Sequence, residues 1–380
     1  FYLISIEAQL RASTDSVELR GTFLKGKKTD LPTMLWFSDL VEPVANHKAF
    51  FEQEGSKILD VRNVWLVDIR NMGQSDHHES FAMEDISADI VRFMDQQKLT
   101  MATLGGHGFG AKVALATAIN NMDRCTGVVN FEGGPLDHRY YESYQELESY
   151  VKIAKDMPVN KMEVSQAAKH INDNITCQKW ASIFKQNLED KGGAATWKFN
   201  VDGLYANMQT RQPDVACWHE RYGLWPGNAL CVFAEQSRWV HLATNTLQFY
   251  NVMPRLQGKF PGHITSWAHG YDSPLNHWIH EGPDKESTWH LSQRLWRWLK
   301  WHDGTNVMLA DKSEAGWYYV PDRGFDVECN TRHGEFTPEH VHHNYLHTGA
   351  YEQSREARGV EGANPGQFLP KGQFTDESKW

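Results

Sequence analysis

Two patterns of hydrophobic residues alternate along the first third of the chain. Residues 83–99 repeat apolar side chains at helical spacing and carry acidic residues near their start, which is typical of a helix N-terminus. A second helical pattern begins near residue 110. Short apolar runs typical of strands surround both helical patterns, at 17–26, 31–40, 64–68, 101–106 and 125–132. Because strands that alternate with helices form parallel sheets, we predict a mostly parallel central sheet with helices on both faces.

Residues 135–225 depart from this alternation. Helical patterns follow one another there, at 140–157, 164–171, 177–190 and 200–210, so we predict an inserted helical cap. Strand patterns resume at 228–236 and 262–270, and a helical pattern follows at 285–302. Beyond it, periodicity fades while His, Gly, Pro and Asn accumulate. The predicted domains are a core of residues 1–134 and 226–302, the cap at 135–225, and an irregular C-terminal extension at 303–380.

The turn at the centre of residues 103–119 carries the strongest chemical signal. Its sequence, Gly106-His107-Gly108-Phe109-Gly110, has the outline of a G-x-S-x-G nucleophile elbow, where a strand turns sharply into a helix and exposes a reactive side chain. The reactive position is Gly108, which has no side chain. Glycine adopts strained turn conformations at little steric cost, so Gly108 keeps the turn and removes the nucleophile.

Several further motifs follow the same order as in one known family. Residues 68–75 read D-I-R-N-M-G-Q-S, residues 106–112 read G-H-G-F-G-A-K, and residues 276–280 read N-H-W-I-H. The predicted cap contains F-x-x-N-L and W-x-x-N-x-x-x-L spacings, formed by Phe184, Asn187, Leu188, Trp197, Asn200 and Leu204. From residue 17 to 302 the chain resembles the α/β-hydrolase superfamily, and within it the bacterial short-chain acyl esterases and the mitochondrial α/β-hydrolase-domain proteins. The resemblance implies an α/β-hydrolase fold.

The same resemblance implies a catalytic triad whose positions are altered here. The nucleophile position is Gly108, the acid position falls on Asn130, and His277 matches the catalytic base. Glu235 is the alternative acid. Ser38 and Asp39 replace the family's H-G pair in the oxyanion loop, where an inward-pointing Asp would repel a developing oxyanion. We therefore predict that the chain is a pseudo-hydrolase without catalytic activity.

The composition limits the cellular compartment and the class of binding partner that we expect for this chain. The net charge of −10 argues against nucleic acid as the main partner, because phosphate binding needs a basic surface. The five scattered cysteines suit a reducing compartment and offer neither a disulfide framework nor a zinc site. No apolar run is long enough to span a bilayer. Since the sequence starts at Phe1 without a Met, we expect that a cleaved targeting segment precedes it. With the mitochondrial relatives, these features predict the matrix or the matrix face of the inner membrane.

Cofactor sites were weighed on two motifs. Gly106, Gly108 and Ala111 match the dinucleotide fingerprint G-x-G-x-x-A, but earlier strands precede this turn, whereas the fingerprint opens the first βαβ unit. The C-terminal extension carries a histidine-dense tract without the fixed ligand spacing of a structural metal site, formed by His333, His340, His342, His343 and His347. We predict no cofactor and no metal, and we interpret this tract as a polar contact segment.

The helix at 285–302 suggests a further surface. Leu291 and Leu295 lie on one face with Trp298 and Leu299, whereas Trp289 and Trp296 lie nearly opposite, so the extension or a partner protein covers them. The interface candidates are Trp289, Trp296, His342, His343 and Phe368.

We predict an accessory or structural subunit of a large mitochondrial assembly, of the respiratory chain or ATP synthase, that contacts other protein subunits through its C-terminal extension. The alternatives are a noncanonical hydrolase that uses His277 with Glu235, or a ligand-binding pseudoenzyme. The latter would hold a lipid or acyl ligand in a cap pocket near His277.

Overall fold

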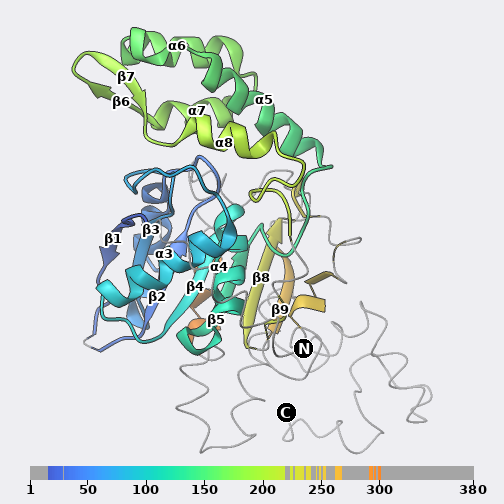
Figure 1. Cartoon of the computed structure of the whole chain (residues 1–380). Helices are drawn as coiled ribbons and strands as arrows, with labels where there is room; N and C mark the ends of the chain where they lie inside the picture. Colours follow the sequence, from blue (N-terminus) through green and yellow to red (C-terminus); the bar gives the residue numbers. More distant parts are fainter. Residues whose placement is uncertain are drawn as a thin grey trace, which may run out of the picture.

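A computed structural model describes most of the chain up to residue 218 and parts of the chain beyond it (Figure 1). The described residues are 16–218 except 29, and then 223–225, 227–234, 237–240, 245, 248–249, 251–253, 262–267, 291–293, 295–296 and 298–300.

A seven-stranded sheet lies at the centre of the described residues, in the order β1-β3-β2-β4-β5-β8-β9. Strand β1 runs antiparallel to β3, and every other neighbouring pair is parallel, which confirms the predicted sheet type. The first two predicted strands flank a turn in the sequence, but β3 lies between them in the sheet. The strands are β1 (Arg20–Leu24), β2 (Thr33–Phe37), β3 (Asn63–Asp68), β4 (Ala102–His107), β5 (Cys125–Phe131), β8 (Ala229–Ala234) and β9 (Gly262–Trp267).

Each face of the sheet is covered by its own hydrophobic cluster, because successive side chains of a strand point to opposite faces. In β2, Leu35 and Phe37 join the larger cluster with the helices α3 (Met83–Gln96) and α4 (Phe109–Asn120). Met34 and Trp36 join the opposite cluster, which also contains side chains from α2 (Lys48–Glu52) and from residues 291–299. The short 3₁₀ helices are η1 (Val44–His47), η2 (Ile58–Asp60), η3 (Met122–Arg124) and η4 (Val159–Lys161).

A helical lobe rises above the sheet in Figure 1. Its helices are α5 (Glu142–Asp156), α6 (Val164–Asn174), α7 (Gln178–Gln186) and α8 (Val201–Met208), in agreement with the predicted series of helices. The prediction that one helix extends to residue 190 is wrong. A hairpin begins at β6 (Leu188–Lys191) and returns through β7 (Ala194–Trp197). Gly192 and Gly193 join its strands at φ values of 71° and 89°, which glycine adopts without strain.

The final described helical residues confirm the predicted core face. Leu291, Leu295, Trp298 and Leu299 are fully buried in the cluster beneath the sheet. Trp296 is half-buried, and the Lys57 and Lys300 ammonium groups lie 4.8 Å and 5.3 Å from its ring. Lysines of this chain therefore cover part of this indole.

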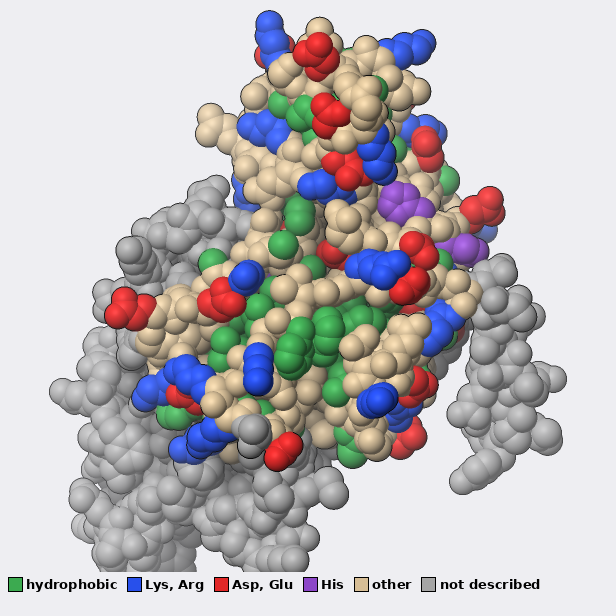
Figure 2. Space-filling view, turned by 90° about the vertical axis from the view of Figure 1, so that its left-hand side faces the viewer, with side chains coloured by type: hydrophobic (Ala, Val, Ile, Leu, Met, Phe, Trp, Pro, Cys, Tyr) green, Lys and Arg blue, Asp and Glu red, His purple; other side chains and the backbone are tan. Residues whose placement is uncertain are grey.

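Hydrophobic side chains gather below the lobe on the face shown in Figure 2, with charged side chains around them. On the edge strand β1, Phe23 is 43% exposed and its ring lies 5.0 Å from that of Trp65. Arg20 at the start of this strand forms an ion pair with Glu18. Charged residues on an edge strand oppose pairing with a second sheet.

Two further predictions can be compared with the described residues. No helix among them is both long and apolar enough to cross a bilayer. Among the described residues, Cys125, Cys177, Cys217 and Cys231 are free thiols. Cys329 lies outside the described part of the chain.

A buried lysine joins the sheet to both ends of the helical lobe. Lys112 of α4 is 1% exposed, and its Nζ donates to the carbonyl oxygens of Leu136 (3.0 Å) and Ala216 (2.8 Å), which precede and follow the lobe. The two segments also bond to each other, since the His138 N–H donates to the Ala216 oxygen at 3.0 Å. Lys112 therefore fixes the position of the lobe over the sheet.

Replacing Lys112 by Met is expected to remove a pH dependence of stability. Burial lowers the pKa of Lys112 to about 7, and Asp137, Cys217 and Asp39 only partly oppose this shift. Above pH 7 the unfolded chain holds one proton more than the folded chain, so wild-type stability gains up to about 1.4 kcal/mol per pH unit until about pH 10.

Urea unfolding of the wild type and of Lys112→Met across this range measures the effect. The difference between their free energies of unfolding should stay flat below pH 7 and grow in favour of the wild type above it. The exposed lysine variant Lys161→Met is the control. Parallel curves for wild type and Lys112→Met would contradict the assignment.

Candidate functional site

The carboxyl ends of three neighbouring parallel strands bring the site together. Phe37 at the end of β2 pairs with Gly106 of β4, and His107 at the end of β4 pairs with Phe131 of β5. The residues that follow these strands therefore meet at one edge of the sheet, which is where open α/β sheets bind their ligands. They are Ser38 and Asp39 after β2, Gly108 after β4, and Glu132 after β5.

Gly108 forms the predicted sharp turn between β4 and α4. Its φ and ψ are 55° and −120°, a conformation that L-residues rarely adopt. A Cβ atom built on Gly108 would overlap the carboxyl group of Asp39. The Asp39 carboxylate therefore occupies the space in which the side chain of a nucleophile at position 108 would begin.

Backbone donors hold the Asp39 carboxylate in this place. Its Oδ1 accepts hydrogen bonds from the N–H of Phe109 at 2.7 Å and from its neighbour Leu40 at 2.8 Å. Phe109 is the first residue of α4, so the helix dipole also favours a negative charge there. These N–H groups occupy the positions of an oxyanion hole, namely the residue after the elbow and the loop after an earlier strand. The Asp that the sequence places in the oxyanion loop therefore points toward the elbow, and its carboxylate takes the donors that a substrate oxyanion would use.

Opposing influences act on the ionisation of Asp39. Burial raises the pKa of Asp39 above its ordinary value and is the largest influence. His107 and the Phe109 N–H favour the ionised form and lower the pKa, whereas Glu42 raises it. The net shift is upward, which makes this carboxylate a better proton acceptor and nucleophile than an exposed Asp.

Glu132, which the sequence analysis missed, is the acidic residue at the end of β5. It is 2% exposed, its φ is 54°, and the Ser237 hydroxyl donates to its Oε2. A buried acid on a strained backbone is typical of a functional position. The predicted acid position, Asn130, still belongs to β5, and its Oδ1 accepts the Gly133 N–H at 3.0 Å. The strand ends at Phe131, and Glu132 is the first acidic residue after it. The position of an acid directly after a buried strand was the sequence signal that could have identified Glu132.

The loop that carries Asp39 is fixed on both sides. The Ser38 hydroxyl donates to the backbone oxygen of Glu42 at 2.6 Å, so it supports the loop instead of facing the elbow. Val41 has a φ of 64°, which is costly for a β-branched residue, and its carbonyl accepts the side-chain amide of Asn187 at 2.5 Å. Asn187 ends helix α7, so the helical lobe holds the loop in its strained form.

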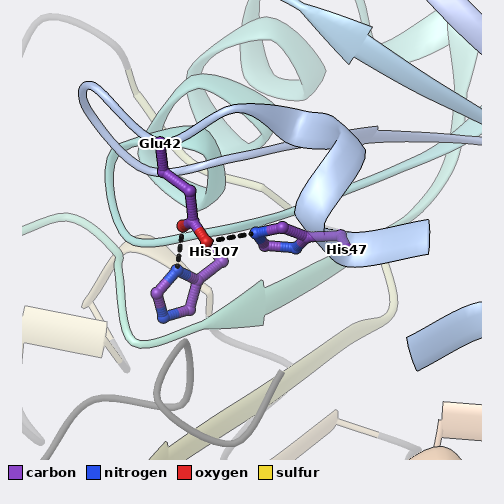
Figure 3. A group of neighbouring side chains, drawn as sticks. All are labelled: Glu42, His47 and His107. Atoms are coloured by element: carbon purple, nitrogen blue, oxygen red, sulfur yellow. Dashed lines mark ion pairs between the residues drawn. The ribbon is translucent and has the colours of Figure 1, made fainter. Parts of the chain in front are cut away.

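A fully buried group of Glu42, His47 and His107 lies behind the elbow (Figure 3). The Glu42 carboxylate lies between the two imidazoles, with Oε1 3.0 Å from His47 Nε2 and Oε2 3.4 Å from His107 Nδ1. Two histidines and one carboxylate whose ligand atoms lie within 4.8 Å of one another have the composition of a metal site.

The hydrogen bond from Trp36 argues against a metal in this group. The Trp36 Nε1–H donates to His47 Nδ1 at 2.7 Å, and an indole nitrogen can only donate. His47 therefore carries its proton on Nε2, toward Glu42, whereas a metal-ligating histidine needs Nε2 bare and usually donates from its other nitrogen. We interpret the group as a buried polar network in which the Glu42 carboxylate lies between the two imidazoles.

Lys179 of the helical lobe interacts electrostatically with acids at the elbow. Burial lowers the pKa of Lys179 in α7, and the charges of Glu42, Asp39 and Glu132 oppose that shift. These charge interactions couple the ionisation of Lys179 to the acids that follow β2 and β5. Such a cation can stabilise negative charge that develops above the elbow.

The other predicted site residues cannot be placed. His277 and Glu235 of the predicted triad lie outside the described residues. The interface candidates Trp289, His342, His343 and Phe368 also lie outside them, as does the histidine-dense tract. The dinucleotide alternative is disfavoured at the elbow itself, since Asp39 places a carboxylate at the helix N-terminus that a phosphate would need.

Comparisons with known proteins agree with this geometry. A family model described as the alpha/beta hydrolase fold matches residues 36–157. A marine microorganism esterase of known structure superimposes with a TM-score of 0.52 at 18% identity, covering 63% of this chain and 88% of that one. The chain has the α/β-hydrolase fold.

Curated relatives share this α/β-hydrolase fold region at low identity. The sn-1-specific diacylglycerol lipase ABHD11 of Danio rerio is 22% identical over 61% of this chain and 67% of its own length. Esterase YbfF of Escherichia coli is 24% identical over 60% of this chain and 80% of its own length. The chain spans about half the length of the yeast alcohol acetyltransferases that it also matches.

These comparisons correct one sequence-based prediction. The absence of a side chain at Gly108 led to the prediction that the chain is not an enzyme. The similar α/β-hydrolase-fold proteins are named lipase and esterase, which points to enzyme activity, so that prediction is wrong. The structure shows why the missing side chain does not settle the question, because the Asp39 carboxylate fills the space at the elbow that Gly108 leaves.

Proposed function

We propose that this chain hydrolyses carboxylic esters, with the Asp39 carboxylate as the reacting group at the elbow. The observation that carries the proposal is the position of this carboxylate, held by the Phe109 and Leu40 N–H groups where the nucleophile of an esterase would lie. The named activities of the ABHD11 and YbfF relatives support ester substrates. Asp39 and Gly108 are both half-buried, so each keeps part of its surface exposed.

The surrounding residues supply the other needs of ester hydrolysis. Burial raises the pKa of Asp39, which makes its carboxylate more basic, while His107 and the backbone donors favour the ionised form. Lys179 of the lobe interacts electrostatically with Asp39, and its charged form would favour negative charge at the elbow. His277, which matches the family's catalytic base in sequence, stays a candidate for activating water.

Location and partners stay at the level of proposals. The similarity to two ABHD11 proteins is consistent with the predicted mitochondrial location, and the matrix side remains part of the proposal. Nothing in the comparisons supports a subunit of a respiratory-chain or ATP-synthase assembly. Contacts of the C-terminal extension with other subunits remain a prediction, because residues 301–380 lie outside the described part of the chain.

Turnover of simple esters tests the proposed function. The purified chain is expected to hydrolyse p-nitrophenyl esters of acetate, butyrate or octanoate with saturation kinetics, and the Asp39→Asn variant prepared in the same way is the control. Since position 108 offers no hydroxyl, a serine-directed fluorophosphonate should leave the rate unchanged. Turnover at the buffer rate for every acyl length, or equal turnover by the control, would contradict the proposal.

A further inference from the structure

The two oxygens of Asp39 have different surroundings. Oδ1 accepts both backbone hydrogen bonds, from Phe109 at 2.7 Å and from Leu40 at 2.8 Å. Among the described residues, Oδ2 accepts no hydrogen bond. One oxygen is therefore fixed in the oxyanion position, and the other is the one that can react with a substrate.

The different surroundings of the two oxygens distinguish two possible roles of the Asp39 carboxylate, a general base and a nucleophile. If Asp39 acted only as a general base for water, the oxyanion of the substrate would need the Phe109 and Leu40 N–H groups, which Oδ1 already occupies. The loss of a single oxyanion donor costs an esterase-type reaction about 10²–10³-fold in rate, so a general base in this position would work against itself.

A nucleophilic role uses the same donors productively. When the Asp39 carbonyl carbon is itself attacked, negative charge develops on Oδ1, which already lies between the two N–H groups. The positive end of the α4 dipole lies at the same point. In the step that releases the acyl group, the tetrahedral intermediate therefore forms on Asp39, with its oxyanion between these donors.

We infer that Asp39 is a covalent nucleophile. This inference rests on the proposed function. Oδ2 attacks the acyl carbon of the ester, the bond to the alcohol oxygen breaks, and the alkoxide takes a proton from water. The product is a mixed anhydride between Asp39 and the acyl group. Water then adds to Cγ of Asp39 and loses a proton to solvent, and the bond between Cγ and Oδ2 breaks. The acyl group leaves as a carboxylate that carries Oδ2, and Asp39 retains the oxygen of the water.

Oxygen-18 labelling distinguishes this route from general-base catalysis. In a single turnover of a p-nitrophenyl ester in ¹⁸O-water, with enzyme in excess, one oxygen-18 atom should appear in Asp39 while the acid product stays unlabelled. Fragment spectra of the tryptic peptide assign the label to Asp39, as opposed to Asp30 or Glu42. Incubation without ester measures spontaneous exchange.

Asp68 is a matched control within the same molecule. It is also a buried Asp that accepts backbone N–H groups, from Gln74 at 3.1 Å and Val44 at 3.4 Å, and burial raises its pKa too. Its peptide should stay unlabelled. Label in the acid product but not in Asp39 would overturn the nucleophilic role and leave the proposed function intact. Failure of the wild type to turn over the ester would overturn both.

Discussion

Restoring the serine of the elbow by Gly108→Ser is expected to destabilise the chain severely, by about 2–5 kcal/mol. About 1–2 kcal/mol comes from placing an L-residue at a φ of 55°. A further 1–3 kcal/mol, roughly, comes from overpacking, because the new Cβ overlaps the Asp39 carboxyl group. Urea unfolding with the free energy extrapolated to water measures this change.

The same substitution should be tolerated once Asp39 is removed. In the double variant Gly108→Ser with Asp39→Gly, the overlap is gone, so we expect it to regain about 1–3 kcal/mol relative to the Gly108→Ser variant. The Phe109 and Leu40 N–H groups are then available to an oxyanion of the substrate. The double variant should therefore become sensitive to fluorophosphonate, unlike the wild type.

Gly73 supplies a matched control for the comparison of the Gly108→Ser variant with the double variant. It has a φ of 56°, and a Cβ atom on it would overlap the carboxyl group of Asp68, which reproduces the geometry of Gly108 and Asp39 elsewhere in the chain. Gly73→Ser should be as destabilising as Gly108→Ser and should gain nothing from Asp39→Gly. If Asp39→Gly rescued both serine variants equally, or neither of them, positions 39 and 108 would not be coupled as the structure indicates.

Replacing Asp39 by Asn is expected to stabilise the chain while it abolishes turnover. The asparagine side chain keeps an oxygen for the Phe109 and Leu40 N–H groups but removes the cost of a buried charge. Because the folded-state pKa of Asp39 is raised, ionising it destabilises the wild type as pH rises through that range. The gain in Tm should therefore be present at neutral pH and vanish in acid.

Thermal unfolding between acid and neutral pH checks this expectation, with the exposed variant Asp123→Asn as the control. A loss of Tm in Asp39→Asn at neutral pH would show that the charge of Asp39 stabilises the fold. That result would contradict the view that Asp39 is retained for reactivity at the expense of stability.

The sequence was sufficient to predict the architecture because the relevant signals are local. Alternating apolar runs predicted the strands, and the glycine turn at 106–110 predicted the elbow that joins β4 to α4. The hairpin of β6 and β7 was missed because helical periodicity continues into residue 188, and only the pair Gly192 and Gly193 indicated a turn.

The site could be predicted only in part because it depends on distances between strands. The sequence showed that position 108 has no nucleophilic side chain and that Asp39 lies in the oxyanion loop. No sequence pattern indicates that the Asp39 carboxylate fills the space beside Gly108. Glu132 was missed because the acid position was assigned to Asn130 from the family resemblance, although Asn130 still belongs to β5. The network of Glu42, His47 and His107 joins a loop and the 3₁₀ helix next to it with a strand that lies far away in the sequence.

The central claim is that the Asp39 carboxylate is the reacting group in place of the side chain that Gly108 lacks. The most direct test is the ratio of kcat/KM for wild type and Asp39→Asn on the same p-nitrophenyl ester at neutral pH. We predict a fall of about 10³-fold or more, since Asn retains the hydrogen bonds of Asp39 but not its charge or reactivity. Equal kcat/KM values for the two proteins would show that the reaction takes place without Asp39 and would contradict this account.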